Sequence, residues 1–193
     1  MTKLGWLFPG QASQYVGMGK DLYKNTNLAK SYFQIANDIL GYNLKTVIFD
    51  GPEMVLKKTE HTQPAIFLIS IILGELLKEK LGNPIVSAGH SLGEYSALTI
   101  ANAFDFEQGM KLIKIRSESM KKACYQKKGT MAAIIGFDDI ILKELCDNYK
   151  GSGDVVIANY NSPNQTIISG SLEAVNFIMK KSKEFGAKLA KEI

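Results

Sequence analysis

The sequence predicts an α/β protein with two domains, and three observations carry that prediction. Short apolar segments typical of buried strands alternate with longer helical segments over residues 1–126. One of these strands runs into a glycine-flanked serine and then into a helix. Residues 127–193 then follow the order strand, helix, strand, strand, helix, strand, which is the ferredoxin-like order. We therefore expect a large α/β domain with a parallel sheet at 1–126 and a ferredoxin-like small domain at 127–193.

The large domain is expected to begin with one strand and two helices. Residues 3–8 are mostly apolar and stop at a Pro-Gly pair, and a glycine-rich loop follows over residues 11–19. Apolar residues at helical spacing predict a helix over residues 27–40. A second helix is predicted over residues 64–81, with Pro64 in its first turn, where a missing amide does no harm.

The most informative segment is a short strand, residues 85–88, that enters the pattern Gly89-x-Ser91-x-Gly93 and then a helix over residues 92–101. This is the pattern of a nucleophile elbow, in which small residues on both sides permit a strained reversal that exposes the serine hydroxyl. The helix N-terminus and the amide of Leu92 are expected at the same point, where they stabilise a developing oxyanion. The alternative interpretation is a turn serine that caps the helix.

The next predicted helix, residues 106–126, carries the only arginine of the chain, Arg116. Arg116 lies nearly opposite the lysine-rich face of this helix, on its apolar side. Burying an unpaired guanidinium there would cost free energy. Arginine is suited to hold a carboxylate through two parallel hydrogen bonds. The residues leave two partners open, an internal Asp or Glu and the carboxylate of a substrate. The apolar neighbours of Arg116 on this helix are Leu112, Ile113, Met120 and Ala123.

The small domain is predicted from four strands and two helices that fit the ferredoxin-like order. Each apolar strand segment is short, and the two helical segments show helical spacing of apolar residues. The strands are residues 130–135, 155–158, 165–169 and 187–193, and the helices are residues 138–149 and 171–185.

Composition excludes several classes of protein. The net charge of +4 comes mostly from lysines spread along the chain, with no cluster dense enough for nucleic acid; solvated lysines explain them more often than an acidic partner does. The longest apolar run, residues 64–73, is interrupted by Ser70 and is too short to span a membrane, and the N-terminus lacks signal-peptide organisation. Cys124 and Cys146 have no metal-ligand spacing, so we expect reduced thiols, no structural zinc and a cytoplasmic protein.

Six segments, in order along the chain, resemble the malonyl-CoA:acyl-carrier-protein transacylase family, which includes the acyltransferase domains of polyketide synthases. The resemblance covers nearly the whole chain, and the six segments together are far more specific than any one of them. They are Phe8-Pro-Gly-Gln-Ala-Ser-Gln14, Thr62-Gln-Pro-Ala65, Gly89-His-Ser-Leu-Gly-Glu-Tyr95, Arg116, Gly129-Thr-Met-Ala-Ala133 and Asn159-Tyr-Asn-Ser-Pro163.

The resemblance implies an α/β-hydrolase-like large domain and a reaction in two halves. Ser91 would accept a malonyl group from coenzyme A and pass it to the phosphopantetheine thiol of an acyl carrier protein. The backbone amides of Gln11 and Leu92 would form the oxyanion hole. Malonyl-CoA and the carrier protein are the expected partners, no metal or other cofactor is needed, and the complete protein is expected to be a monomer.

The resemblance also assigns residues to the acyl pocket. Arg116 matches the arginine that binds the malonyl carboxylate, Gln63 lines the same pocket, and His90 is the histidine beside the nucleophile. Two residues depart from the family pattern, because Ser117 stands where Gly is common and Lys121 where Gln is common. We expect these changes to alter the fine shape of the pocket and to leave the carboxylate contact in place.

A serine nucleophile needs a base, and the chain has only two histidines, His61 and His90. His90 is excluded because adjacent side chains on an elbow diverge. In the family the catalytic histidine follows the last strand of the small domain, so we expect a fragment that lacks the C-terminal return segment and is weakly active and marginally folded alone. Other interpretations are a segment supplied by another chain, an inactive carrier-protein-binding module, and a serine hydrolase or thioesterase, against which Arg116 argues.

Overall fold

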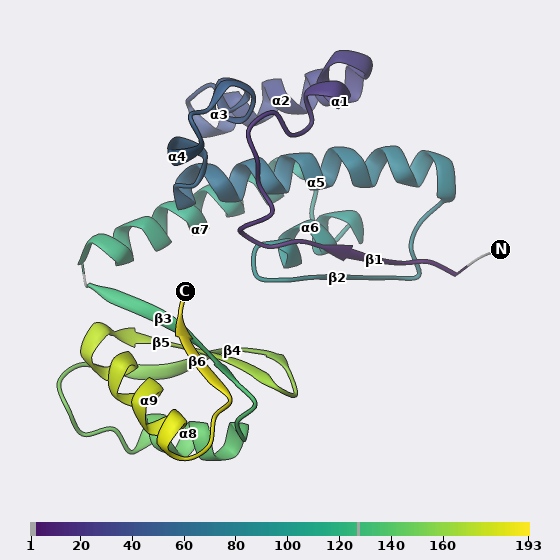
Figure 1. Ribbon diagram of the computed structural model, residues 1–193. Coiled ribbons are helices and arrows are strands. Elements are labelled where there is room, and N and C mark those ends of the chain that lie inside the picture. The colour runs from purple at the N-terminus through teal and green to yellow at the C-terminus, as the bar shows by residue number, and fades with distance from the viewer. Residues whose placement is uncertain (1–2, 127) are drawn as a thin grey trace. The chain divides into compact units, whose positions relative to one another are not determined.

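The computed structural model describes residues 3–126 and 128–193 and shows a mixed α/β protein (Figure 1). It divides into two compact units, Met1–Lys122 and Ala123–Ile193. This division falls four residues before the predicted boundary, and Lys127, the first residue of the predicted small domain, lies outside the described residues. One sheet is parallel and the other is antiparallel, so the predicted α/β class is confirmed.

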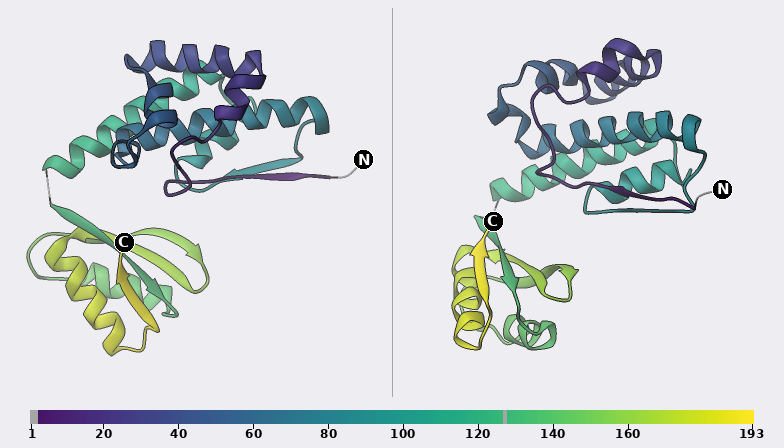
Figure 2. Two further views of the ribbon diagram at one scale, coloured as in Figure 1. Left: turned by 45° about the horizontal axis from the view of Figure 1, so that its top comes forward. Right: turned by 45° about the vertical axis from the view of Figure 1, so that its right-hand side comes forward.

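The sheet of the first unit consists of β1 (Gly5–Phe8) and β2 (Val86–Gly89), paired in parallel from Gly5 with Val86 to Phe8 with Gly89. The helices of this unit lie on one face of the sheet (Figures 1 and 2). Helix α6 (Gly93–Ile100) packs on both strands, and α5 (Thr59–Leu81) packs on α6. On the opposite face, the side chains of Leu7 and Val86 are 85% and 59% exposed.

Helix α2 (Asn27–Leu40) has the predicted bounds. Thr26 caps its first turn by accepting a hydrogen bond from the amide of Ala29 at 3.1 Å, and Gly41 ends it with a φ of 80°. Three short helices were not predicted, because each has only four to seven residues, too few to show helical spacing of apolar residues. They are α1 (Lys20–Asn25), α3 (Leu44–Asp50) and α4 (Glu53–Leu56).

Helix α5 begins at Thr59, so the predicted start at residue 64 was wrong and Pro64 lies inside the helix. The amide that proline lacks would donate to the carbonyl oxygen of Glu60. The hydroxyl of Tyr42, which lies between α2 and α3, donates to that oxygen at 3.0 Å instead. A tertiary hydrogen bond therefore replaces the missing helical one, and the helix extends through the proline.

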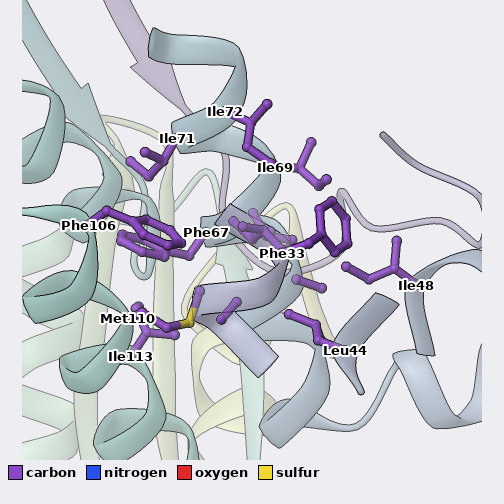
Figure 3. Packing of buried hydrophobic residues seen from close by; sticks show 14 of the residues in the cluster. Phe33, Leu44, Ile48, Phe67, Ile69, Ile71, Ile72, Phe106, Met110 and Ile113 are labelled. Atoms are coloured by element: carbon purple, nitrogen blue, oxygen red, sulfur yellow. The ribbon is translucent and has the colours of Figure 1, made fainter. Parts of the chain in front are cut away.

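The core of the first unit forms where α2, α5 and α7 (Phe106–Gln126) meet (Figure 3). The rings of Phe67 and Phe106 stack with centroids 5.9 Å apart. A side chain on Gly109 would lie 2.5 Å from the ring of Phe67, so this glycine leaves room for that ring against α7. The buried face of α7 comprises Phe106, Gly109, Met110, Ile113 and Ser117.

This face corrects the predicted surroundings of Arg116. The buried stripe runs from Ile113 to Ser117, and Arg116 lies at its edge and is only partly buried. Leu112 and Met120, predicted to surround the arginine in an apolar stripe, are 41% and 40% exposed, and Ala123 is exposed as well. The physical reason is that the buried stripe passes through Ile113 and Ser117, and Arg116 is rotated by about 100° from Ser117 around the helix, to one side of that stripe.

The second unit has the predicted element order, with sheet order β4-β5-β3-β6 and antiparallel neighbours. Ala132, Ile168 and Ala190, from three of its strands, contribute to a hydrophobic core separate from that of the first unit. Strand β4 extends four residues beyond the prediction, through two irregularities in its pairing. The elements are β3 (Gly129–Ile135), α8 (Asp139–Asp147), β4 (Val155–Ser162), β5 (Gln165–Ser171), α9 (Leu172–Glu184) and β6 (Leu189–Glu192).

No helix in the described part of the chain is long and apolar enough to cross a membrane. Both cysteines are free thiols, Cys124 exposed and Cys146 buried.

Candidate active site

The turn between β2 and α6 has a strained backbone centred on Ser91. Ser91 is exposed and has a φ of 54°, a left-handed conformation that non-glycine residues rarely adopt. A side chain on Gly89 would lie 1.9 Å from the carbonyl carbon of Gly93, and one on Gly93 would lie 2.4 Å from the carbonyl oxygen of Phe8. Both glycines are therefore required by close packing of backbone on backbone, which presents Ser91 at the tip of the turn.

Two backbone amides near Ser91 are candidates for the oxyanion hole. Within residues 3–126 and 128–193, neither the amide of Leu92 nor that of Gln11 donates a recorded hydrogen bond. The loop that carries Gln11 lies against the turn, because a side chain on Gly10 would come within 2.9 Å of the carbonyl oxygen of His90. The same side chain would lie 2.8 Å from Nδ1 of His90, which places the His90 ring beside Gly10. The predicted oxyanion-hole residues thus belong to neighbouring segments.

The structure brings Ser91, Arg116 and Gln63 together from three elements. Arg116 Nη2 donates to Ser91 Oγ at 2.9 Å, and Arg116 Nη1 donates to Gln63 Oε1 at 2.6 Å. The guanidinium carbon lies 5.8 Å from the centre of the Tyr95 ring. None of the salt bridges recorded among the described residues involves Arg116. An internal carboxylate was one of the two predicted partners, and the arginine has neutral partners in its place.

Gln63 is 1% exposed, and both ends of its side-chain amide are hydrogen-bonded. Its Oε1 accepts from Arg116, and its Nε2 donates to the sulfur of Met120 at 3.1 Å. Arg116 Nη1 donates to the same sulfur at 3.2 Å. The sequence had suggested Met120 only as an apolar neighbour, yet its position four residues after Arg116 is the spacing at which helical side chains meet. Tyr95, whose ring lies beside the Arg116 guanidinium, was not predicted as a site residue because this contact depends on how α6 and α7 pack.

His61 lies outside this cluster, although it precedes Gln63 by only two residues. Its ring packs edge-on against Tyr42 with centroids 5.0 Å apart, and its Nδ1 is buried without a hydrogen-bond partner among the described residues. Burial lowers the pKa of His61, which favours the neutral imidazole.

The two residues that depart from the family pattern share a cavity with His61. Ser117 and Lys121 line a space of about 220 Å³ together with Tyr42 and Glu60. Ser117 Oγ donates to the carbonyl oxygen of Lys114 at 3.0 Å, and Lys121 Nζ lies 2.8 Å from Glu60 Oε1. Both departures therefore line a cavity with Glu60 and His61, which precede Gln63 on α5.

Among the described residues, no group of three or more His, Cys, Asp or Glu side chains is placed to hold a metal ion. The chemical groups that converge at Ser91 are a hydroxyl, a guanidinium and a buried amide.

The fold and this site together define the class of α/β proteins that present a serine on a strand-turn-helix elbow. Within this class, the chain belongs to the acyl transferase domain family, which matches residues 5–193. The family resemblance found in the sequence is therefore confirmed.

Two curated relatives show how close the similarity is. The malonyl CoA-acyl carrier protein transacylase of Bacillus subtilis strain 168 is 42% identical over 191 residues, which are 98% of this chain and 60% of the relative. The protein of the same name from a Synechocystis species is 46% identical over 182 residues, 94% of this chain and 59% of the relative. The chain thus spans about 60% of the length of the curated relatives it matches.

Solved structures agree with the sequence comparison. The malonyl CoA-acyl carrier protein transacylase from Coxiella burnetii superposes with a TM-score of 0.89 at 38% identity, over 99% of this chain and 61% of that one. A malonyl-transacylase in complex with a type II PKS acyl-carrier protein gives the same TM-score and identity, over 100% of this chain and 62% of that one.

Proposed function

We propose that the protein transfers a malonyl group from coenzyme A to the phosphopantetheine thiol of an acyl carrier protein through a malonyl-Ser91 intermediate. The observation that carries the proposal is the hydrogen bond from Arg116 Nη2 to Ser91 Oγ at 2.9 Å. One methylene separates the carboxylate of a malonyl thioester from its reacting carbonyl. A guanidinium that touches the nucleophile is therefore within reach of that carboxylate when the carbonyl meets the serine.

Each half-reaction exchanges one acyl bond for another. Ser91 Oγ attacks the thioester carbonyl, the bond to the coenzyme A sulfur breaks, and the serine proton passes through a base to the departing thiolate. The amides of Gln11 and Leu92 would hold the oxyanion. In the second half, the carrier thiol attacks the malonyl ester, and the oxygen of Ser91 leaves and regains a proton.

The base is proposed to be a histidine outside these 193 residues, as the resemblance implies. His61 lines the cavity behind Gln63, and His90 lies beside Gly10. The curated relatives are longer than the region they share with this chain.

We also propose a fold for each of the two units. The order β4-β5-β3-β6, with antiparallel neighbours and two helices, supports a ferredoxin-like small domain beginning near Ala123. The parallel strands and the elbow support an α/β-hydrolase-like large domain, completed by a return segment. A carrier protein is the proposed partner because a relative of similar fold was solved with one. The proposed chemistry requires no cofactor, and the complete protein is proposed to be a monomer.

Intact-mass spectrometry after a brief incubation with malonyl-CoA tests this function. We expect one malonyl adduct on the 21.3 kDa chain and none on Ser91→Ala. Slow formation is expected without the base, because general base catalysis contributes a factor of about 10² to 10⁴. No adduct after prolonged incubation would contradict a nucleophilic Ser91, and rapid loss of the adduct to water would favour a hydrolase.

The variant Arg116→Ala then tests whether Arg116 binds the carboxylate of the substrate or has only a structural role. We expect malonyl adduct formation to fall about 100-fold, the value of a lost charge-assisted pair, while acetyl adduct formation from acetyl-CoA is spared or improved. The unfolding midpoint in urea is the control for folding. An equal loss with both thioesters would show that Arg116 acts structurally.

A further inference from the structure

Pro64 leaves one carbonyl group of α5 without its helical donor, and a residue from another element supplies the replacement. The oxygen of Glu60 accepts the hydroxyl of Tyr42 at 3.0 Å. Burial and the nearby carboxylates of Glu60 and Glu118 raise the pKa of Tyr42, so the hydroxyl keeps the proton that it donates. The turn of α5 that carries Gln63 is therefore held at its backbone by Tyr42.

The side chain of Glu60 holds the same turn from the other direction. Its carboxylate lies 2.8 Å from Lys121 Nζ, and the two side chains are 18% and 42% exposed. Burial opposes ionisation of Glu60, but the hydrogen bond from Lys121 and the positive charge beside it outweigh this and lower the pKa. The ion pair thus joins the turn of α5 that precedes Gln63 to the turn of α7 that follows Arg116.

The Arg116–Gln63 contact depends on how well these two turns are held together. Gln63 Oε1 fixes one guanidinium nitrogen, and Ser91 Oγ accepts from the other. Met120, which precedes Lys121 in the chain, accepts from both Gln63 and Arg116. A small rotation of either turn would separate these groups, and group-transfer chemistry is sensitive to displacements of about 1 Å.

We propose that Glu60 is a positioning residue, anchored by Tyr42 and Lys121, that orients Gln63 and through it Arg116 toward Ser91. The inference rests on the proposed function for its consequence, which is selective recognition of a malonyl group. It also assigns a role to Lys121, a departure from the family pattern: its ion pair with Glu60 connects α7 to α5.

Arg116 offers a direct probe of its own orientation because the chain contains no other arginine. In a ¹⁵N-labelled sample, its Nε–Hε resonance is identified without assignment. We expect Glu60→Gln and Tyr42→Phe each to move and broaden this resonance in the ligand-free protein. The charge-swapped double variant, Glu60→Lys with Lys121→Glu, should restore it toward the wild-type position.

The matched control is Glu107→Gln, which breaks an exposed Lys111–Glu107 bridge on the same helix α7. It should leave the Arg116 resonance unchanged. Urea unfolding of each variant separates reorientation from loss of structure, and if the double variant does not fold, Tyr42→Phe decides. A wild-type resonance in both Glu60→Gln and Tyr42→Phe would overturn the proposal, as would a folded double variant no closer to wild type than Glu60→Gln.

A ligand titration, in a Ser91→Ala background that prevents acylation, tests the consequence separately. We expect Glu60→Gln to raise the Kd for malonyl-CoA about fivefold, the upper range for a partly exposed ion pair, with the Kd for acetyl-CoA unchanged. An equal rise for both would indicate a structural role and overturn the proposal. If malonyl-CoA does not move the Arg116 resonance of the Ser91→Ala protein that carries no second substitution, the proposed function fails. The comparison of the ligand-free variants then still decides whether Glu60 positions Arg116.

Discussion

At the scale of single residues, Arg116 is notable for the neutrality of its recorded partners. A hydroxyl, an amide oxygen, a thioether sulfur and an aromatic ring contact its guanidinium. The first three accept hydrogen bonds from the guanidinium, and none of the four carries a charge. A carboxylate that enters the site therefore gains a charge-assisted bond that no neutral acyl group makes.

Another residue-scale consequence concerns His61 and pH. Because burial lowers its pKa in the folded state, the folded protein binds fewer protons than the unfolded chain below the ordinary pKa of about 6.5. The stabilisation is complete above that value and is lost as the pH falls toward the lowered pKa. We expect the urea midpoint to fall between about pH 7.5 and about pH 5.5. His61→Gln should flatten this dependence, and an unchanged dependence would contradict the assignment.

The sequence predicted three members of the site, Ser91, Arg116 and Gln63, that the structure brings together. The serine was predictable because its glycine neighbours form a local pattern, and the arginine because it is the only arginine of the chain and a guanidinium beside a buried helix face requires a partner. Met120 and Tyr95 could not be ranked above other apolar residues, since their contribution depends on which helices meet. Spacing in the sequence identifies candidate residues, but only the packing of the folded helices determines which of them contact Arg116.

At the scale of elements, the elbow depends on backbone segments that touch where a side chain would stand. Gly93→Ala would place a methyl group 2.4 Å from the carbonyl oxygen of Phe8 and 2.7 Å from that of Pro9, and neither backbone atom can yield as a flexible side chain would. We expect a loss of at least about 2 kcal/mol in the free energy of unfolding. Trp6 fluorescence in urea measures it, because Trp6 lies on the adjoining strand β1.

The matched control is Gly41→Ala at the end of α2. This glycine has a positive φ of 80°, unlike Gly93, but no atom of the described residues lies within 4 Å of an added side chain. Its substitution should cost only the backbone term of about 1 kcal/mol. A loss at Gly93 no larger than that at Gly41 would contradict the expected clash of an added side chain with the backbone.

Element boundaries were predicted well where a cap or a glycine marks them, as for α2, and poorly where tertiary contacts decide. Pro64 was placed at a helix start because proline inside a helix leaves one carbonyl group without its donor. The hydroxyl of Tyr42 supplies that donor, so proline is tolerated inside α5. The sequence contains no sign of this, because the two residues are 22 positions apart and meet only in the folded unit.

At the scale of the whole molecule, the two hydrophobic cores share no residue. Each unit should therefore lose its structure by its own transition. Ile168→Ala, in the core of the second unit, is expected to cost that unit about 3 kcal/mol and to leave the Trp6 fluorescence midpoint in place. Ile72→Ala, in the first core, should lower that midpoint. Equal shifts of the fluorescence midpoint in the two variants would mean a single cooperative molecule.

The face of the β1–β2 sheet opposite the helices is expected to affect how the protein behaves in concentrated samples. Leu7 and Val86 face water there, although parallel sheets are ordinarily covered on both sides. Two molecules that meet through these sides shield each other's apolar groups, and mass action strengthens the attraction as samples are concentrated. These two exposed side chains, on strands of four residues each, are therefore expected to favour association and turbidity in concentrated samples.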